Sequence, residues 1–266
     1  MTIRMKQVME TKQYPLFIPF IMAGDPTPEV TIDLALTLQE AGAHVLELGI
    51  PYSDPLADGP VIQRSAKRAL QHQMSLQKAL ELVPKMRAQG LTIPVIVFTY
   101  YNPLLQFGED RFIEQAKQYE IDGLLVPDLP FEESEHVATL CENADLSFIS
   151  LVAPTSKQRI EKIAHHAQGF LYCVSSLGVT GVRNEFSPSV YEFLEEVKQH
   201  STIPIAVGFG ISNKEQVDAL ATHCDGIIVG SAIIKLVEEL ERQLKAENTR
   251  KEALSSIKTF VLSLIS

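Results

Sequence analysis

The stretch ELGIPYSDPLADGPVIQ, residues 47–63, decides how the rest of the chain is interpreted. It continues an apolar run that starts at Val45, and then breaks into a loop that contains three prolines and a glycine. Glu47 lies within the apolar strand pattern, while Asp54 and Asp58 follow in the loop. A carboxylate at the end of a rigid strand and a second one on the adjoining loop can flank a small substrate from two sides, as acid–base chemistry requires. The sequence therefore indicates Glu47 and Asp58 as candidate catalytic residues.

A purely structural explanation of this stretch is the alternative. A single Glu at a strand end often serves as an ion-pair partner, and acidic, proline-rich segments are often only connections. However, the prolines and Gly59 restrict the path of this loop strongly. In folds with parallel sheets, catalytic residues are also commonly located at the carboxyl ends of the strands. Both arguments favour a functional site.

Eight short apolar runs alternate with segments of helical periodicity along the whole chain. Continuous apolar strands are typical of sheets that are buried on both faces. We expect strands at residues 16–23, 44–48, 94–100, 123–126, 147–151, 169–174, 203–207 and 226–229. Eight such units predict an α/β protein with a single (β/α)8 TIM barrel. No G-x-G-x-x-G motif follows the first strand, which argues against a dinucleotide-binding sheet.

The helical segments include more helices than a plain barrel needs. We expect helices at residues 2–12, 29–41, 61–71, 76–88, 110–119, 132–142, 156–167, 188–200 and 214–222, and a long helix pair from residue 232 onward. The extra helices fall at the N-terminus, after the second strand and after the eighth strand. No linker or change of composition divides the chain, so residues 1–266 are expected to form one domain.

Composition excludes several classes of protein. The formal net charge of −10 argues against binding to nucleic acid, which needs a basic face. No apolar run is long enough to span a bilayer, and the polar N-terminal segment does not resemble a signal peptide. Three widely spaced cysteines without a C-x-x-C motif are typical of a reduced, cytoplasmic protein. No set of Cys, His and carboxylate residues has the spacing of metal ligands, so no metal is expected.

Glycine-bearing loops follow the last three predicted strands. They contain the segments GVTG at residues 178–181, GFG at 208–210 and GS at 230–231. Glycine lets backbone N–H groups approach an anion closely. The last segment also precedes a helix, whose N-terminus carries a partial positive charge. Together these loops predict a phosphate site that needs no Lys or Arg.

Residues 47–63 resemble, almost residue for residue, the corresponding segment of the tryptophan synthase alpha chain family. The segments GVTG, GFGIS and GSAI match the phosphate-loop motifs of that family in the same order, and the similarity extends along the whole chain. The resemblance implies a carbon–carbon lyase of L-tryptophan biosynthesis. Its reaction is the retro-aldol cleavage of indole-3-glycerol phosphate to indole and glyceraldehyde 3-phosphate, without a cofactor in this chain.

The resemblance also assigns roles to particular residues. Glu47 would donate and later accept a proton, Asp58 would accept a hydrogen bond from the indole N–H group, and Tyr172 is a third, weaker catalytic candidate. The implied phosphate contacts are Thr180, Gly181, Phe209, Gly210, Gly230 and Ser231. The implied indole pocket consists of Phe20, Phe98, Leu125 and Tyr172. For Phe98 and Leu125, ordinary core packing is an equally good explanation.

Proline and apolar residues are concentrated in the loops after the second, third and fourth strands. Exposed apolar groups on one rim indicate a binding surface, although some of these groups must pack onto the barrel. The candidate interface residues are Pro51, Asp54, Asn102, Pro103, Leu104, Asp128 and Pro130. By resemblance, the partner is the pyridoxal-phosphate-dependent beta chain in an α2β2 assembly, to which indole passes. The loop at residues 175–186 is expected to form a lid over the phosphate site.

Two other functions fit part of the pattern. Another phosphate-binding barrel, such as a phosphoribosyl isomerase or an indole-glycerol-phosphate synthase, would lack the loop of residues 51–60. The synthase would also need a catalytic Lys on an early strand, and residues 16–23 and 44–48 contain none. A non-catalytic regulatory subunit would be favoured if Glu47 or Asp58 had been replaced, but both are present.

Overall fold

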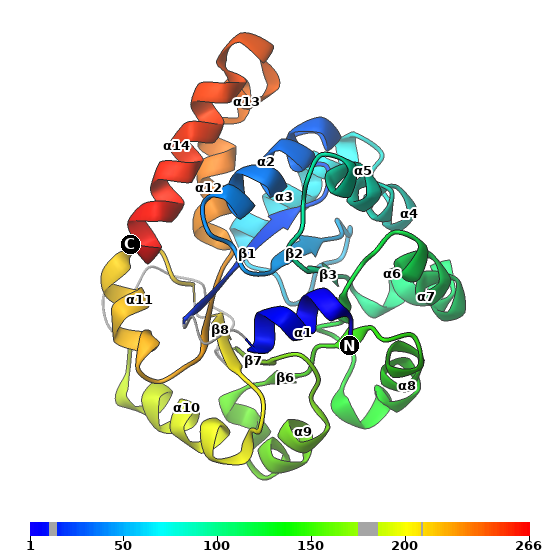
Figure 1. Ribbon diagram of the computed structural model, residues 1–266, viewed down its shortest axis with the longest axis vertical. Coiled ribbons are helices and arrows are strands. Elements are labelled where there is room, and N and C mark those ends of the chain that lie inside the picture. Colours follow the sequence, from blue (N-terminus) through cyan, green and yellow to red (C-terminus); the bar gives the residue numbers. More distant parts are fainter. Residues whose placement is uncertain (11–14, 175–185, 209) are drawn as a thin grey trace.

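A closed parallel β-barrel forms the centre of the protein, and helices surround it (Figure 1). This computed structural model describes residues 1–10, 15–174, 186–208 and 210–266. The strands are β1 (Leu16–Met22), β2 (Leu46–Gly49), β3 (Val95–Phe98), β4 (Gly123–Leu125), β5 (Ser147–Phe148), β6 (Leu151–Val152), β7 (Leu171–Val174), β8 (Ile205–Gly208) and β9 (Gly226–Val229). All of their pairings are parallel, in the order β5-β4-β3-β2-β1-β9-β8-β7-β6.

The fifth predicted strand, residues 147–151, closes the barrel. Its first part, β5, pairs with β4, and its second part, β6, pairs with β7. The two residues between these parts continue the ladder on both sides. The Ile149 N–H donates to the Leu124 carbonyl at 2.9 Å, and the Ser150 carbonyl accepts from the Tyr172 N–H at 2.9 Å. Strands β5 and β6 are therefore one interrupted strand, and the predicted (β/α)8 barrel is confirmed.

The helices form the outer layer of the molecule (Figure 1). They are α1 (Ile3–Glu10), α2 (Pro28–Glu40), α3 (Pro60–Gln71), α4 (Leu76–Leu80), α5 (Leu82–Ala88), α6 (Tyr101–Phe107), α7 (Glu109–Gln118), α8 (Glu135–Asn143), α9 (Ile160–His166), α10 (Pro188–His200), α11 (Lys214–Ala221), α12 (Ser231–Glu239), α13 (Glu241–Lys245) and α14 (Glu247–Ile265), with short 3-10 helices η1 (Phe131–Glu133) and η2 (Pro154–Arg159). Their apolar faces cover the outer face of the barrel.

The sequence did not predict all of these helices correctly. Helix α6 lies where a loop was expected, because it is short and buries only Leu104, which leaves no periodic pattern to detect. The predicted helix at residues 76–88 is divided into α4 and α5 at Glu81. The expected helix pair at the chain end consists of three helices, α12, α13 and α14.

Helix α1 closes the barrel at the amino ends of the strands. Its Met5 is fully buried among the inward-facing strand residues. Arg4 of α1 donates to the buried Asp122 carboxylate at 3.0 Å, and Arg87 of α5 donates to the other oxygen of Asp122 at 2.8 Å. Because α1 and this ion pair occupy the amino end, the interior can open only at the carboxyl ends of the strands.

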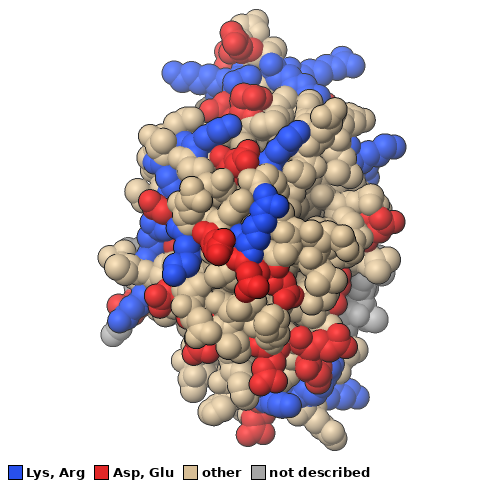
Figure 2. Space-filling model, turned by 90° about the vertical axis from the view of Figure 1, so that its right-hand side faces the viewer, with Lys and Arg blue, Asp and Glu red and all other residues tan. Residues whose placement is uncertain are grey.

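The surface carries charges of both signs. On the face shown in Figure 2, Lys and Arg side chains are interspersed with Asp and Glu. Such a mixture is typical of a solvated surface and not of a face that binds phosphate backbones. Among the described residues, no helix is both long and apolar enough to cross a membrane.

Candidate active site

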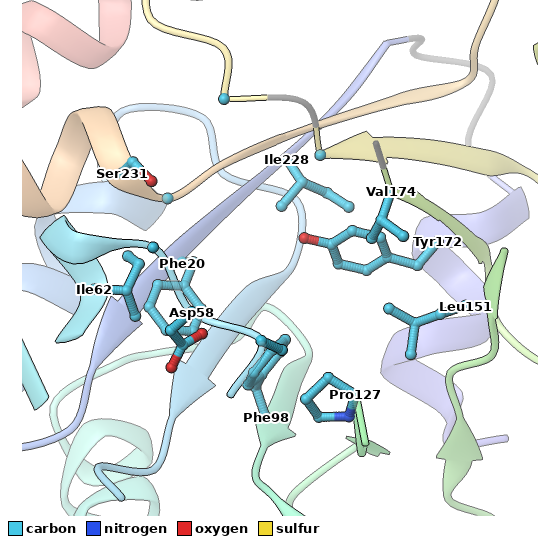
Figure 3. Close-up of a pocket in the computed structure, with 15 residues that line it drawn as sticks. Phe20, Asp58, Ile62, Phe98, Pro127, Leu151, Tyr172, Val174, Ile228 and Ser231 are labelled. Carbon is cyan, nitrogen blue, oxygen red and sulfur yellow. The ribbon is translucent and has the colours of Figure 1, made fainter. Parts of the chain in front are cut away.

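A cavity of about 330 Å³ opens at the carboxyl ends of the strands. Phe20, Ile62, Asp58 and Phe98 lie on one side of it, and Leu151, Val174 and Tyr172 lie on the other (Figure 3). The lining residues are Phe20, Ala57, Asp58, Gly59, Ile62, Phe98, Pro127, Leu151, Tyr172, Val174, Gly208, Gly210, Ile228, Gly230 and Ser231. The location agrees with the position of active sites in barrels of this kind.

Glu47 is fully buried in β2. It follows Val45, which faces the barrel interior, by two residues, and alternation along a strand places both side chains on the same face. Among the described residues, neither oxygen of the Glu47 carboxyl group has a hydrogen-bond partner. Burial raises its pKa to about 8. Glu47 therefore carries a proton at neutral pH and can act as an acid.

Asp58 lies on the loop between β2 and α3, in the wall of the cavity. Partial burial raises its pKa to about 6, and a hydrogen bond with Tyr100 opposes that rise. The Tyr100 hydroxyl also accepts a hydrogen bond from the Ala57 N–H at 3.0 Å. Asp58 is thus mostly ionised at neutral pH, in contrast to Glu47. Two carboxyl groups with different protonation states at one site are suited to acid–base chemistry.

Tyr172 lies within the electrostatic influence of both carboxyl groups. It lies on β7 with its hydroxyl directed into the cavity (Figure 3). Burial raises its pKa well above the usual value, and the charges of Glu47 and Asp58 raise it further. The charges of both carboxyl groups reach Tyr172, so the three predicted catalytic candidates lie near one another; Asp58 and Tyr172 line the cavity, whereas Glu47 is fully buried and does not line it. Gly208 is necessary for this arrangement, because a Cβ atom there would lie 2.6 Å from the Tyr172 hydroxyl oxygen.

The apolar wall includes two of the aromatic residues predicted for a ring pocket. Phe20 and Phe98 contact each other edge to face, with ring centroids 5.5 Å apart, and both line the cavity. Leu125 does not line it. Its side chain is fully buried in the core inside the barrel. Phe98 thus lines the cavity, whereas Leu125 packs beside Tyr172 and Ile228 inside the barrel, and its role in the ring pocket stays a prediction.

The opposite end of the cavity consists of backbone and a helix N-terminus. Gly230 precedes the first residue of α12, Ser231, and both line the cavity together with Gly210. Gly210 has a φ of 70°, a left-handed conformation that favours glycine. The other predicted phosphate contacts, Thr180, Gly181 and Phe209, lie outside the described residues, as does nearly all of the expected lid, residues 175–186.

The predicted interface residues do not all lie on the surface. Asp54, Asn102, Asp128 and Pro130 are exposed, and Pro103 is half-buried. Pro51, at the start of the loop, is buried. Leu104 is also buried, because it lies on the face of α6 that packs against the core. These two residues cannot belong to an exposed rim. The side chain of Leu56, in contrast, is 92% exposed at the tip of the Asp58 loop.

Several cavity residues were not predicted. Tyr100, which contacts the Asp58 loop from outside the cavity lining, was not predicted as a site residue either; it ends the third predicted strand, and a polar aromatic residue at a strand end is a signal that could have been used. The other unpredicted lining residues are small or apolar and have no signal that separates them from the core or from an ordinary turn: Ala57, Gly59, Ile62, Pro127, Leu151, Val174 and Ile228. The described part of the chain contains no group of three His, Cys, Asp or Glu residues that could hold a metal ion.

A buried acid and a cavity at the carboxyl end of a (β/α)8 barrel define the chain as a barrel enzyme. The family model of the tryptophan synthase alpha chain matches residues 5–261. The chain belongs to this family.

Relatives and solved structures agree with this assignment. The chain is 67% identical over 251 residues to the tryptophan synthase alpha chain of Halalkalibacterium halodurans, covering 94% of this chain and 95% of the relative. It is 59% identical over 250 residues to that of Geobacillus stearothermophilus, covering 94% and 93%. The alpha subunit structure from Legionella pneumophila has a TM-score of 0.87 and 36% identity, covering 98% of this chain and 96% of that one. A chain of the α2β2 complex from Pyrococcus furiosus has a TM-score of 0.85 and 36% identity, covering 94% and 98%.

Family membership determines the reaction. The chain is a carbon–carbon lyase of tryptophan biosynthesis that cleaves indole-3-glycerol phosphate to indole and glyceraldehyde 3-phosphate. Alpha chains of this family work without a cofactor, and pyridoxal phosphate belongs to the beta chain.

Proposed function

We propose that Glu47 is the proton donor and acceptor of this cleavage and that Asp58 stabilises the positive charge on the indole ring. The observation that carries the proposal is the buried Glu47 carboxyl group, which has no hydrogen-bond partner among the described residues. Leaving a buried polar group unpaired costs about 1–3 kcal/mol. The cost is understandable if the substrate supplies the missing partner.

The reaction needs two proton transfers at neighbouring atoms. Neutral Glu47 donates its proton to indole carbon 3, and the ring then becomes a cation that can accept electrons. The electron pair of the bond between the ring and the glycerol chain moves into the ring, while the adjacent hydroxyl group loses its proton and becomes the aldehyde. The Glu47 carboxylate accepts that proton, so the acid is regenerated. The raised pKa of Glu47, about 8, suits both steps.

Asp58 is ionised when Glu47 is not, because its pKa of about 6 lies lower. A hydrogen bond from the indole N–H group to a carboxylate becomes stronger as the ring gains positive charge. Tyr100 supports this role, since its hydroxyl keeps the pKa of Asp58 lower than burial alone would. Tyr172 is proposed to contact the glycerol hydroxyl groups, since its hydroxyl is directed into the cavity.

The substrate orientation follows from the two ends of the cavity. The indole ring lies against Phe20 and Phe98, and the phosphate group lies at Gly210, Gly230 and Ser231, where no side chain of the described residues caps the N-terminus of α12. Thr180, Gly181 and Phe209 are proposed to complete the phosphate site. Leu125 supports the ring pocket only from the core.

The partner is a beta chain of tryptophan synthase in an α2β2 assembly, as in the complex from Pyrococcus furiosus. The exposed tip of the Asp58 loop, Leu56, supports docking at this rim together with Asp54, Asn102, Asp128 and Pro130. Docking there orders the loop that carries Asp58 and favours the active conformation. Indole then passes to the beta chain.

We also propose that residues 1–266 act as one barrel domain in the cytoplasm. Both described chain ends pack onto the barrel: Met5 from one end and Ile257 and Val261 from the other are fully buried. Cys141, Cys173 and Cys224 are free and buried, as expected in a reducing compartment.

The deciding experiment is release of indole from indole-3-glycerol phosphate by the purified chain, alone and with a cognate beta chain. We expect cleavage in both cases and faster cleavage in the complex. A chain that binds the beta chain but releases no indole in either case would be a regulatory subunit, and the proposed roles of Glu47 and Asp58 would be wrong.

A further inference from the structure

A chain of ion pairs connects three elements that each bring residues to the cavity. Asp25 follows β1 and is 1% exposed. Its carboxylate accepts two hydrogen bonds from Arg68 of α3, both at 2.7 Å, and one from Ser65 of the same helix. A third nitrogen of Arg68 donates to Glu238 of α12 at 2.7 Å. One guanidinium group therefore connects β1, α3 and α12.

The same three elements carry the two functional ends of the cavity. Helix α3 begins at Pro60, directly after the loop that holds Asp58, and its Ile62 lines the cavity. Helix α12 begins at Ser231, at the glycine-lined end. Since a helix is rigid, a rotation that starts at Arg68 or Glu238 displaces the residues at its other end. The distance between Asp58 and Ser231 thus depends on how α3 and α12 are held together.

We propose that Arg68 is a positioning residue that sets the spacing between the Asp58 carboxylate and the α12 N-terminus. This inference rests on the proposed function of these two ends. The planar guanidinium is suited to the task, because it presents two parallel N–H groups to Asp25 and a further one to Glu238. A lysine at this position keeps the positive charge but cannot satisfy both carboxylates with this geometry.

The chain contains two matched controls. Arg64 lies on the same helix and pairs with the same Glu238 at 2.8 Å, but its side chain is 52% exposed and it donates no hydrogen bond to Asp25 among the described contacts. Arg87 makes an equally buried pair with Asp122, at the opposite end of the barrel. The first control tests loss of an Arg on α3, and the second tests loss of a buried ion pair without any effect on the cavity.

The experiment compares Arg68→Lys, Arg64→Lys and Arg87→Lys by calorimetric binding of glycerol 3-phosphate, by kcat and KM for indole-3-glycerol phosphate, and by urea unfolding. For Arg68→Lys we expect kcat/KM to fall by about tenfold or more and the Kd for glycerol 3-phosphate to rise. The reason is that small displacements of positioned groups lower the reaction rate by at least that factor. Arg64→Lys should stay within about twofold of wild type in both quantities. Arg87→Lys should be less stable but equally active.

Two results would overturn the proposal. One is an Arg68→Lys protein that matches Arg64→Lys in Kd and kcat/KM. The other is a loss of activity in Arg87→Lys as large as that in Arg68→Lys, since stability alone would then explain both. If Arg68→Lys does not fold, Glu238→Gln is compared with Arg64→Lys, because the first change weakens the contacts of both arginines with α12 and the second weakens only that of Arg64. The Kd for glycerol 3-phosphate should rise in Glu238→Gln and not in Arg64→Lys, and an unchanged Kd in Glu238→Gln refutes the inference. Absence of cleavage by the wild-type chain would instead refute the proposed function.

Discussion

The hydroxyl group of Tyr100 accepts a hydrogen bond from the Ala57 N–H at 3.0 Å and lowers the pKa of the adjacent Asp58 carboxyl group. Tyr100, two residues after the end of β3, thereby holds the loop that follows β2. The Tyr52 ring packs against the Tyr100 ring, with centroids 5.4 Å apart, and adds to this contact. The position and the charge of Asp58 therefore depend on a side chain from the neighbouring strand.

Tyr100→Phe should raise the pKa of Asp58 above about 6, because the hydrogen bond that lowers it is lost while burial remains. The acidic limb of the pH profile of kcat/KM should move to higher pH, and activity at pH 7 should fall. Tyr52→Phe is the control, since its hydroxyl contacts Asn102 and not Asp58. An acidic limb at the same pH in Tyr100→Phe and wild type would contradict the proposed role of Tyr100.

The wild-type profile itself should be bell-shaped. Cleavage requires an ionised Asp58 and a protonated Glu47, whose pKa values are about 6 and about 8. Activity should rise as pH increases through about 6 and fall as it increases through about 8. Glu47→Gln and Asp58→Asn should each lower kcat by on the order of 10²–10⁴-fold without unfolding the protein. The assignment of Glu47 is wrong if Glu47→Gln keeps more than about a tenth of wild-type kcat.

Glu47 should also make stability depend on pH. Its pKa is raised from 4.5 to about 8 on folding, so the folded state binds more protons than the unfolded state between these values. The free energy of unfolding should therefore be highest below pH 4.5, as far as Glu47 is concerned, and decrease as pH rises toward 8, by at most about 1.4 kcal/mol per pH unit. Glu47→Gln removes this contribution. Urea unfolding at pH 5 and pH 8 should show that the mutant gains stability relative to wild type at the higher pH. If the free energies of unfolding of mutant and wild type differ by the same amount at both pH values, Glu47 is not a buried neutral group.

Gly49→Ala should damage the indole end of the cavity selectively. A Cβ atom at residue 49 would lie 2.4 Å from Cζ of Phe20, so the ring must move. Because β2 and β1 are otherwise unchanged, we expect a higher KM for indole-3-glycerol phosphate but an unchanged Kd for glycerol 3-phosphate, which lacks the ring. If binding of both ligands is weakened equally, Phe20 does not contact the indole ring.

Leu56→Ser should weaken the complex with the beta chain and reduce its activation of cleavage, since Leu56 is 92% exposed on the loop that carries Asp58. Activity of the isolated chain should change little. Leu262→Ser is the control, because this leucine is 39% exposed on α14. Analytical ultracentrifugation with a cognate beta chain measures the effect. Complex formation that is equally strong in both mutants would place the interface elsewhere.

The sequence by itself determined the barrel and the two carboxyl groups. Strand and helix periodicities are local, so eight alternating apolar runs were sufficient to predict the architecture. Glu47 and Asp58 lie in one continuous segment, and a charge inside an apolar strand is visible without any knowledge of the fold. The glycines at residues 210 and 230 were found in the same way, and both line the cavity.

Only the tertiary structure decided which neighbours these residues have. Phe98 and Leu125 are paired across β3 and β4, yet Phe98 lines the cavity and Leu125 is fully buried in the core. Tyr100 and Arg68 act on carboxylates that are far away in the chain. Such contacts depend on strand register and on the closure of the barrel, which are set by the packing of all strands together. No local pattern in the sequence predicts these contacts, because an apolar residue that lines the cavity and one that packs in the core have the same sequence pattern.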